Sequence, residues 1–265
     1  MKKVISKDGT SIAYDQIGAG PALILIDGAF CSRTFGPMPK LAELLAPGFT
    51  VISYDRRGRG DSTDTQPYAV EREIEDLEAL INEAGGSAFV FGMSSGAVLG
   101  LRAVAGRLNI KKLALYEPPF VVDKKTGHQP PADHREHVAQ LIAADQRGSA
   151  VKYYLVKVMG MPAIFFYMMR LMPVWPKMKA IASSLPYDSA LMGEFGLPAG
   201  VLSAVTIPTL VSGGEKSPAL LRKAVEAVSK TLPHAQLQLL KGQTHNVDVK
   251  VLAPVLAEFF RKYQD

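Results

Sequence analysis

The amino-acid sequence predicts an α/β fold: a mostly parallel β-sheet flanked by helices, with a helical cap inserted after the sixth strand. Three observations predict it, namely short continuous apolar runs, amphipathic stretches between most of them, and one long stretch without such runs. Continuous apolar runs are typical of strands buried on both faces, as when crossover helices cover a parallel sheet. The composition fits a packed globule, since 48% of the 265 residues are hydrophobic and 21% are charged.

The strands are predicted in order from the start of the chain. Residues 4–17 alternate between apolar and polar side chains and contain Asp8-Gly9, a pair that favours a hairpin turn. Continuous apolar runs then predict buried strands at residues 22–26, 50–54, 88–91, 112–116, 209–212 and 236–240. Apolar residues at helical spacing predict helices between most of them, at residues 69–84, 95–107, 220–232 and 251–262. This alternation predicts parallel strands joined by helical crossovers.

Residues 124–202 interrupt the alternation, because they contain no convincing strand and several prolines. Helices or helical fragments are expected at residues 133–147, 150–159 and 161–178. The last of these is rich in Met, Phe and Tyr and contains Trp175. We therefore expect a core domain made of residues 1–123 and 203–265, with residues 124–202 forming a helical cap over one end of the sheet.

Charge and composition exclude several classes of protein. The 30 Lys and Arg exceed the 25 Asp and Glu by five, but no aromatic residues interleave with the basic clusters, so no nucleic-acid partner is predicted. The longest apolar run, residues 161–169, contains Pro162 and falls well short of the ~20 residues that span a bilayer, so no membrane span is expected. The N-terminal lysines are not followed by an apolar signal segment, which favours a cytoplasmic location. Cys31 is the single cysteine, and no disulfide, metal site or cofactor is predicted.

The strongest chemical signal is Gly92-Met93-Ser94-Ser95-Gly96, which fits the pattern G-x-S-x-G. It follows a predicted strand and opens a predicted helix, the context in which a tight turn lifts the serine hydroxyl above the sheet. Ser94 is therefore the candidate nucleophile. The N–H of Ser95 is a candidate oxyanion donor, and a second donor is expected from Gly28 or Ala29, in the loop after residues 22–26.

A serine hydroxyl needs a base to become a nucleophile, and His245 is the candidate. It lies in the loop between the last predicted strand and the last predicted helix. In a parallel sheet this loop lies at the carboxyl edge, beside Ser94. The other four histidines, at residues 128, 134, 137 and 234, are expected to be peripheral.

These motifs resemble those of the α/β-hydrolases over nearly the full length of the chain. Residues 54–62, Tyr-Asp-Arg-Arg-Gly-Arg-Gly-Asp-Ser, are similar to the family signature after its fourth strand, and residues 24–29 occupy the oxyanion-loop position. Arg56, Arg57 and Arg59 of the signature are expected to brace loops.

The resemblance implies a triad acid between Ser94 and His245 in the chain. Most members carry it as Asp in a turn after the seventh strand, but Ser217 stands at that position here. A minority place it after the sixth strand, where this chain has Glu117. Glu117 is therefore the candidate acid, with Glu215 as the alternative.

The combination of Asp27-Gly28, a Ser-Ser-Gly elbow and Glu117 is similar to that of hydrolases that open the macrocyclic lactone zearalenone. The resemblance implies a cofactor-free carboxylic ester hydrolase, an esterase or lactonase, whose partner is a small-molecule ester or lactone. Candidate substrate contacts are Asp27, Phe30, Met168 and Trp175, although Asp27 is equally expected only to hold its loop. A lyase, a thioesterase or a haloperoxidase using the same triad, or a ligand receptor with a slow hydrolase site, are the alternatives. The sequence leaves open whether the protein is a homodimer.

Overall fold

A computed structural model describes residues 1–122 and 128–262, and its described strands form one sheet in the order β1-β2-β4-β3-β5-β6-β7-β8. The strands are β1 (Lys2–Ile5), β2 (Ser11–Ile17), β3 (Ala22–Ile26), β4 (Thr50–Tyr54), β5 (Ala88–Met93), β6 (Ile110–Tyr116), β7 (Thr209–Gly214) and β8 (Ala235–Leu240). β2 pairs antiparallel with β1 and β4, whereas β4, β3, β5, β6, β7 and β8 run parallel. The predicted mostly parallel sheet is confirmed.

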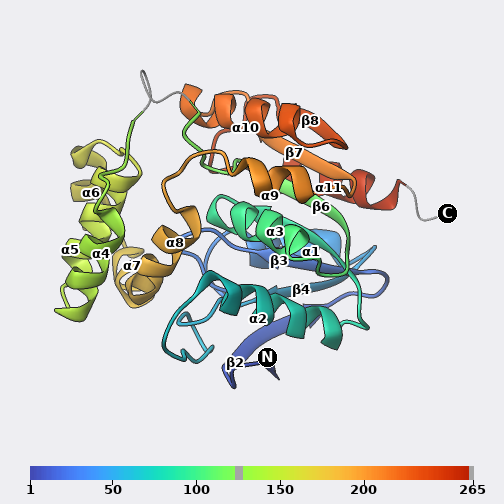
Figure 1. Ribbon diagram of the computed structural model, residues 1–265, viewed down its shortest axis with the longest axis horizontal. Helices are drawn as coiled ribbons and strands as arrows, with labels where there is room; N and C mark the ends of the chain where they lie inside the picture. Colours follow the sequence, from blue (N-terminus) through green and yellow to red (C-terminus); the bar gives the residue numbers. More distant parts are fainter. Residues whose placement is uncertain (123–127, 263–265) are drawn as a thin grey trace.

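Helices cover both faces of this sheet (Figure 1). α1 (Met38–Leu45) and α11 (Val249–Arg261) pack together on one face. α2 (Val70–Glu83), α3 (Ser95–Ala105) and α10 (Ala219–Thr231) cover the other. The central strands contribute side chains to the packing against both helical layers, because successive side chains of a strand point to opposite faces of the sheet.

The register of the central strands produces two apolar layers. Ile24, Val90 and Leu113 are neighbours across three strands and join the core on the α3 side. Phe91 and Ala114, one residue further along, join the core on the α1 and α11 side. The continuous apolar runs of the sequence are explained by this burial on both faces.

The helical insert after β6 is also confirmed, and it stands beside the sheet at the carboxyl ends of the strands (Figure 1). Its helices are α4 (His134–Ala143), α5 (Arg147–Tyr153) with a π-helical turn η1 (Tyr154–Val158), α6 (Ala163–Met169), α7 (Trp175–Ile181) with a short 3₁₀ turn η2 (Ala182–Ser184), and α8 (Leu185–Met192). The expected start of the cap at Lys124 lies outside the described residues.

Two details of the insert differ from the sequence expectations. The helix expected at residues 133–147 ends early: α4 stops at Ala143, the chain leaves the helical conformation around Asp145, whose φ is +53°, and Arg147 already begins α5. α9 (Ala199–Ala204) begins within the predicted cap range, which ends at residue 202, but packs on α3 and α10, against the core of the sheet. Within the described ranges, no helix combines the length and the apolar character needed to cross a bilayer.

Candidate active site

Ser94 occupies a sharp turn between β5 and α3. Its φ is +55°, a conformation that costs energy for a residue with a side chain and that is typical of functional sites. The flanking glycines permit the turn, because a Cβ on Gly92 would lie 2.3 Å from the carbonyl oxygen of Gly96. A Cβ on Gly96 would equally lie 2.3 Å from the carbonyl oxygen of Ile26. The close contact of these backbones explains why the elbow needs glycine at both positions.

The loop after β3 lies directly against the elbow. A Cβ on Gly28 would stand 3.0 Å from the Ser94 Cβ, so that Gly28 and Ser94 are neighbours in space. Ala29, Ser94 and Ser95 line one pocket together. The structure therefore brings together the three residues from which the two backbone oxyanion donors were expected.

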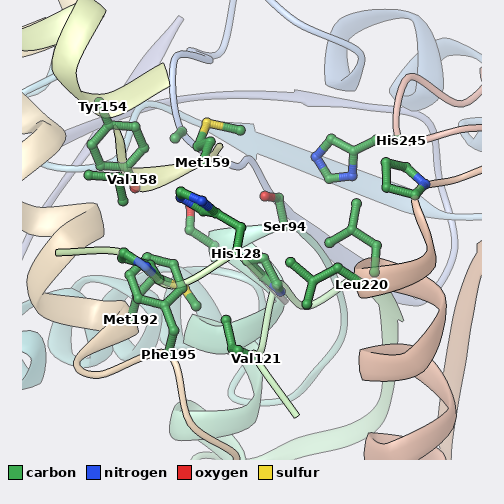
Figure 2. A pocket seen from close by; sticks show the side chains of 16 residues that line it. Ser94, Val121, His128, Tyr154, Val158, Met159, Met192, Phe195, Leu220 and His245 are labelled. Carbon is green, nitrogen blue, oxygen red and sulfur yellow. The ribbon is translucent and has the colours of Figure 1, made fainter. Parts of the chain in front are cut away.

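His245 and Glu117 meet behind the pocket. The His245 Nδ1 lies 2.7 Å from Glu117 Oε2, within hydrogen-bond distance. Glu117 is fully buried, and His245 is 28% exposed. Because Nδ1 faces the carboxylate, Nε2 is the ring nitrogen of His245 that is available on the pocket side. Figure 2 shows the His245 imidazole and the Ser94 hydroxyl at this pocket, which both residues line. The hydroxyl of Tyr116 donates to the carbonyl of Thr244 (2.6 Å) and holds the histidine loop in place.

The turn after β7 supports Glu117 instead of supplying the acid. The Gly214 N–H donates to Glu117 Oε1 (2.7 Å), and the Ser217 hydroxyl donates to the same oxygen. Ser217, at the position where the resemblance had implied Asp, therefore stabilises a carboxylate that follows β6. Glu215 is exposed, and its Oε2 accepts from the Gly242 N–H (3.2 Å). Of the two candidate acids, the structure places Glu117 against His245.

The pocket above Ser94 encloses about 150 Å³ and has mostly apolar walls. Its lining side chains come from the segment after β6, the insert and α10, and they include Val121, Tyr154, Val158, Met159, Met192, Phe195 and Leu220 (Figure 2). His128, which we expected to be peripheral, also lines the pocket, with its Nε2 2.8 Å from the carbonyl oxygen of Lys157. No sequence signal marks His128, because it lies in an irregular loop whose path depends on the insert.

Two candidate substrate contacts lie behind the pocket instead of lining it. Asp27 is buried, and its Oδ1 has no hydrogen-bond partner among the described residues. Burial raises the pKa of Asp27 well above its ordinary range, against the opposing effect of the Arg59 and Arg56 guanidiniums. Phe30 is also buried, and its ring packs edge-on against Tyr154 at 5.6 Å between centroids. Asp27 and Phe30 therefore hold the loop and the pocket wall from behind.

The two contacts expected from the insert lie elsewhere. Trp175 packs edge-on against Phe166 and lines depressions on the outside of the insert. Met168 is 56% exposed on α6. Contrary to expectation, Trp175 and Met168 do not line the pocket above Ser94. The insert turns η1 and the end of α8 toward that pocket, whereas Trp175 lines the outer depressions together with residues of α5.

A buried ion network joins the insert to the oxyanion loop, and sequence reasoning missed its central residue, Asp188 of α8. The fully buried Asp188 accepts hydrogen bonds from Arg56 (2.8 Å), Arg59 (2.6 Å) and the Ser95 hydroxyl (2.7 Å). Arg59 also donates to the carbonyl of Gly28 (2.6 Å). Burial raises the pKa of Asp188, but the two guanidiniums outweigh it and hold that pKa below its ordinary value. Asp188 thus supports both loops of the expected oxyanion site: it binds Ser95 directly and the Gly28 loop through Arg59.

We expect Asp188→Asn to lower the free energy of unfolding by about 3 kcal/mol, because removing one partner leaves buried guanidiniums without a counter-charge. The measurement is urea unfolding of the variant and the wild type. Asp145→Asn is the matched control, since Asp145 is 85% exposed and its pair with Arg147 lies on the surface, where such pairs contribute little. Equal losses in the two variants would contradict the role assigned to Asp188.

In the parts of the chain that the structure describes, no three His, Cys, Asp or Glu side chains are grouped as a metal site would require. The site combines a serine on a strained strand-to-helix turn, a His–carboxylate pair, the neighbouring loop after β3 and an apolar pocket. This arrangement, on a sheet of this order, defines a class of hydrolase.

Residues 18–253 match the Alpha/beta hydrolase family, and the chain belongs to that family. It is similar to the crystal structure of an alpha/beta hydrolase from Sphaerobacter thermophilus DSM 20745, with 48% identity, a TM-score of 0.91, and coverage of 98% of this chain and 100% of that one. A thermophilic esterase from Thermogutta terrifontis shares the fold at 22% identity, a TM-score of 0.75, and coverage of 98% of each chain. The uncharacterized hydrolase YraK of Bacillus subtilis is 36% identical over 97 residues, about a third (35%) of the length of each protein.

Proposed function

We propose that the protein is a serine hydrolase of carboxylic esters, lactones included, that works through a Ser94–His245–Glu117 triad and an acyl-enzyme. The observation that carries the proposal is the 2.7 Å contact between His245 Nδ1 and Glu117 Oε2 beside a serine on a strained elbow. A His–carboxylate pair adjoining such a serine supplies the nucleophile, the base and the group that orients the base. The triad itself needs no cofactor.

In the proposed reaction the Ser94 oxygen attacks the ester carbonyl carbon while His245 Nε2 takes the hydroxyl proton. The carbonyl electron pair moves to the oxygen, where the N–H groups of Ser95 and of Gly28 or Ala29 stabilise the negative charge. Collapse of this intermediate breaks the bond to the leaving alkoxide, which receives the proton from His245. Water then attacks the acyl-enzyme by the same steps, and the acid product leaves with Ser94 regenerated. With a lactone, the alcohol stays attached to the acyl group until hydrolysis.

The charge on Glu117 supports the imidazolium that forms in each half of the reaction. Its second oxygen is occupied by the Gly214 N–H and the Ser217 hydroxyl, so that the carboxylate is fixed in one orientation toward His245. This arrangement fits a general base whose tautomer is set by its neighbour.

The substrate class is proposed from the pocket walls and from the relatives. The lining is mainly apolar, with aromatic rings from Tyr154 and Phe195, which favours an apolar acyl or alkyl group over a charged one. A structure of the same fold is described as an esterase, which supports ester hydrolysis among the reactions that this fold performs.

A substrate panel tests the proposal. We expect the purified protein to hydrolyse short and medium p-nitrophenyl esters. An aromatic macrocyclic lactone is included in the panel, and its rate relative to these esters shows whether the space under the insert admits a large ring. An acyl thioester and a halide–peroxide assay are run alongside. Preferred turnover of the thioester would assign a thioesterase, and halogenation without ester cleavage would assign a haloperoxidase; either result would overturn the ester assignment. Tight retention of product after a single turnover would favour a ligand receptor.

A further inference from the structure

The positive charge of this protein is concentrated in one part of the helical insert. Between Asp145 and Asp188 there is no acidic residue, whereas the same stretch contains six basic residues, namely Arg147, Lys152, Lys157, Arg170, Lys177 and Lys179. This leaves 24 of the 30 basic residues against all 25 acidic residues in the remainder of the chain. The net charge of +5 therefore arises entirely from residues 146–187. An asymmetry of this kind indicates a surface that meets an anionic partner.

The same stretch exposes large apolar side chains on one helix face. Ile164, Phe165 and Met168 of α6, with Leu171 and Met172 in the following turn, are between 52% and 88% exposed. Their spacing corresponds to one stripe of a helix, while Phe166 points inward and is 3% exposed. We call Ile164, Phe165, Met168, Leu171 and Met172 the cap ridge. Single exposed apolar residues are ordinary, but a contiguous group marks an interaction site.

Basic side chains close to α6 pair with aromatic rings of the insert. Lys152 Nζ lies 3.1 Å from the Tyr167 hydroxyl and 5.9 Å from the centre of the Phe166 ring. Arg170 and Lys179 both lie within 6.0 Å of the Trp175 ring, which in turn packs against Phe166 under α6. An apolar stripe flanked by cations and interfacial aromatic residues is the pattern of helices that lie on anionic lipid surfaces.

A groove connects the cap ridge to the candidate active site. It has a volume of about 650 Å³ and runs between the insert and α10. Phe165, a member of the ridge, lines this groove together with Met159 and Met161, and Met159 also lines the pocket above Ser94. Leu220, Leu221 and His245 also line the groove, with Lys223 among the other lining residues, so that the groove reaches the candidate base. An apolar molecule that leaves a lipid layer at the ridge therefore has an apolar path to His245.

We propose that the cap ridge docks onto an anionic lipid surface and that the groove delivers esters dissolved in that surface to the triad. The docking proposal is based on the exposed cap ridge and on the positive charge of residues 146–187. The delivery step rests on the proposed function. A second copy of the chain fits this face poorly, because pairing two ridges would bring together two segments that each carry six basic and no acidic residues.

Vesicle sedimentation tests the docking without any assay of activity. The full chain is mixed with vesicles of phosphatidylcholine alone, or of phosphatidylcholine with 30% phosphatidylglycerol. Each positive charge near an anionic surface contributes about 1 kcal/mol to the free energy of membrane binding. We therefore expect at least tenfold stronger partitioning onto the anionic vesicles than onto the neutral ones, and we expect high salt to abolish this difference. Equal partitioning onto both kinds of vesicle, or onto neither, would overturn the docking proposal.

The variant Met168→Ser/Leu171→Ser tests the cap ridge itself. Neither side chain lines the groove or the pocket, so hydrolysis of a soluble short ester should be unchanged. Partitioning onto anionic vesicles should fall about tenfold or more, since two apolar side chains no longer enter the lipid. Leu44→Ser/Leu237→Ser is the control, because both leucines are exposed but lie on α1 and β8. An equal loss in the control would contradict the assignment to the ridge.

A long-chain ester dissolved in the anionic vesicles tests delivery. The wild type should hydrolyse this ester several-fold faster than Met168→Ser/Leu171→Ser, while both proteins hydrolyse the soluble ester at the same rate. Equal rates of the two proteins on the vesicle ester would overturn the delivery step. Sedimentation velocity completes the set, because a wild-type dimer that becomes monomeric in Met168→Ser/Leu171→Ser would assign the ridge to a second copy instead. If the protein hydrolyses no ester, the proposed function fails while vesicle sedimentation still decides the docking.

Discussion

Replacing Ser94 by alanine is expected to lower kcat for ester hydrolysis by about 10⁴- to 10⁶-fold. The variant keeps the Cβ but removes the oxygen that attacks the carbonyl, so no acyl-enzyme can form. The thermal midpoint should stay close to that of the wild type, since alanine at the elbow fills the same space apart from the hydroxyl. The measurement is turnover of the best ester of the panel by both proteins at matched concentration.

Two controls make this result specific. A fluorophosphonate should add its mass to the wild type and not to Ser94→Ala, and the labelled peptide should contain Ser94. Ser203→Ala, at an exposed serine of α9, should hydrolyse the ester and take up the label like the wild type. Turnover of the Ser94→Ala variant within tenfold of the wild type would remove Ser94 from the mechanism.

Replacing Glu117 by glutamine is expected to lower kcat by about 10³- to 10⁴-fold. Glutamine has nearly the same shape, but it carries no charge to stabilise the imidazolium, and its amide group can hold His245 in the wrong tautomer. The hydrogen bonds from Gly214 and Ser217 to the carboxylate show how completely this position is built around an anion. The loss should appear in kcat far more than in KM, because Glu117 acts on the base behind the pocket and not on the substrate.

Glu215→Gln is the matched control for this prediction. Glu215 is exposed and accepts one hydrogen bond from the backbone of Gly242, so its substitution should change kcat less than threefold, as expected for a surface residue away from the site. The opposite ranking, with Glu215→Gln impaired and Glu117→Gln active, would transfer the role of the acid to the turn after β7.

Local patterns made much of the fold and of the candidate site predictable. The apolar runs predicted the parallel strands, because a strand buried on both faces has no polar side to display. The elbow was visible from a few residues, since the strained turn needs glycine on both sides of Ser94. His245 could be proposed because it follows a strand, and the carboxyl ends of parallel strands meet at one edge of the sheet. Glu117 also follows a strand, but it was preferred to Glu215 because of the resemblance to a minority pattern among the α/β-hydrolases.

The substrate contacts were not predictable in the same way. Trp175 and Met168 belong to an apolar, aromatic stretch, and such a stretch looks alike whether it lines a pocket or covers the outside of an insert. The pocket instead takes Val158 from η1, and Met192 and Phe195 from the end of α8 and the turn that follows it. Asp27 and Phe30 adjoin the oxyanion loop in sequence, yet their side chains turn into the core. Asp188 carries no motif, and its role depends on two arginines more than 120 residues away in the chain.

The sequence by itself determined the fold class, the elbow serine and the strand-end residues that the sheet gathers at its edge. These depend on local backbone geometry and on the two-sided burial of strands, both of which leave short-range patterns. Only the tertiary structure decided that Glu117 and not Glu215 contacts His245, that His128 faces the pocket, and that α6 turns its apolar face outward. Each of these depends on how distant segments pack, and packing is a property of shape complementarity among many side chains that no single segment records.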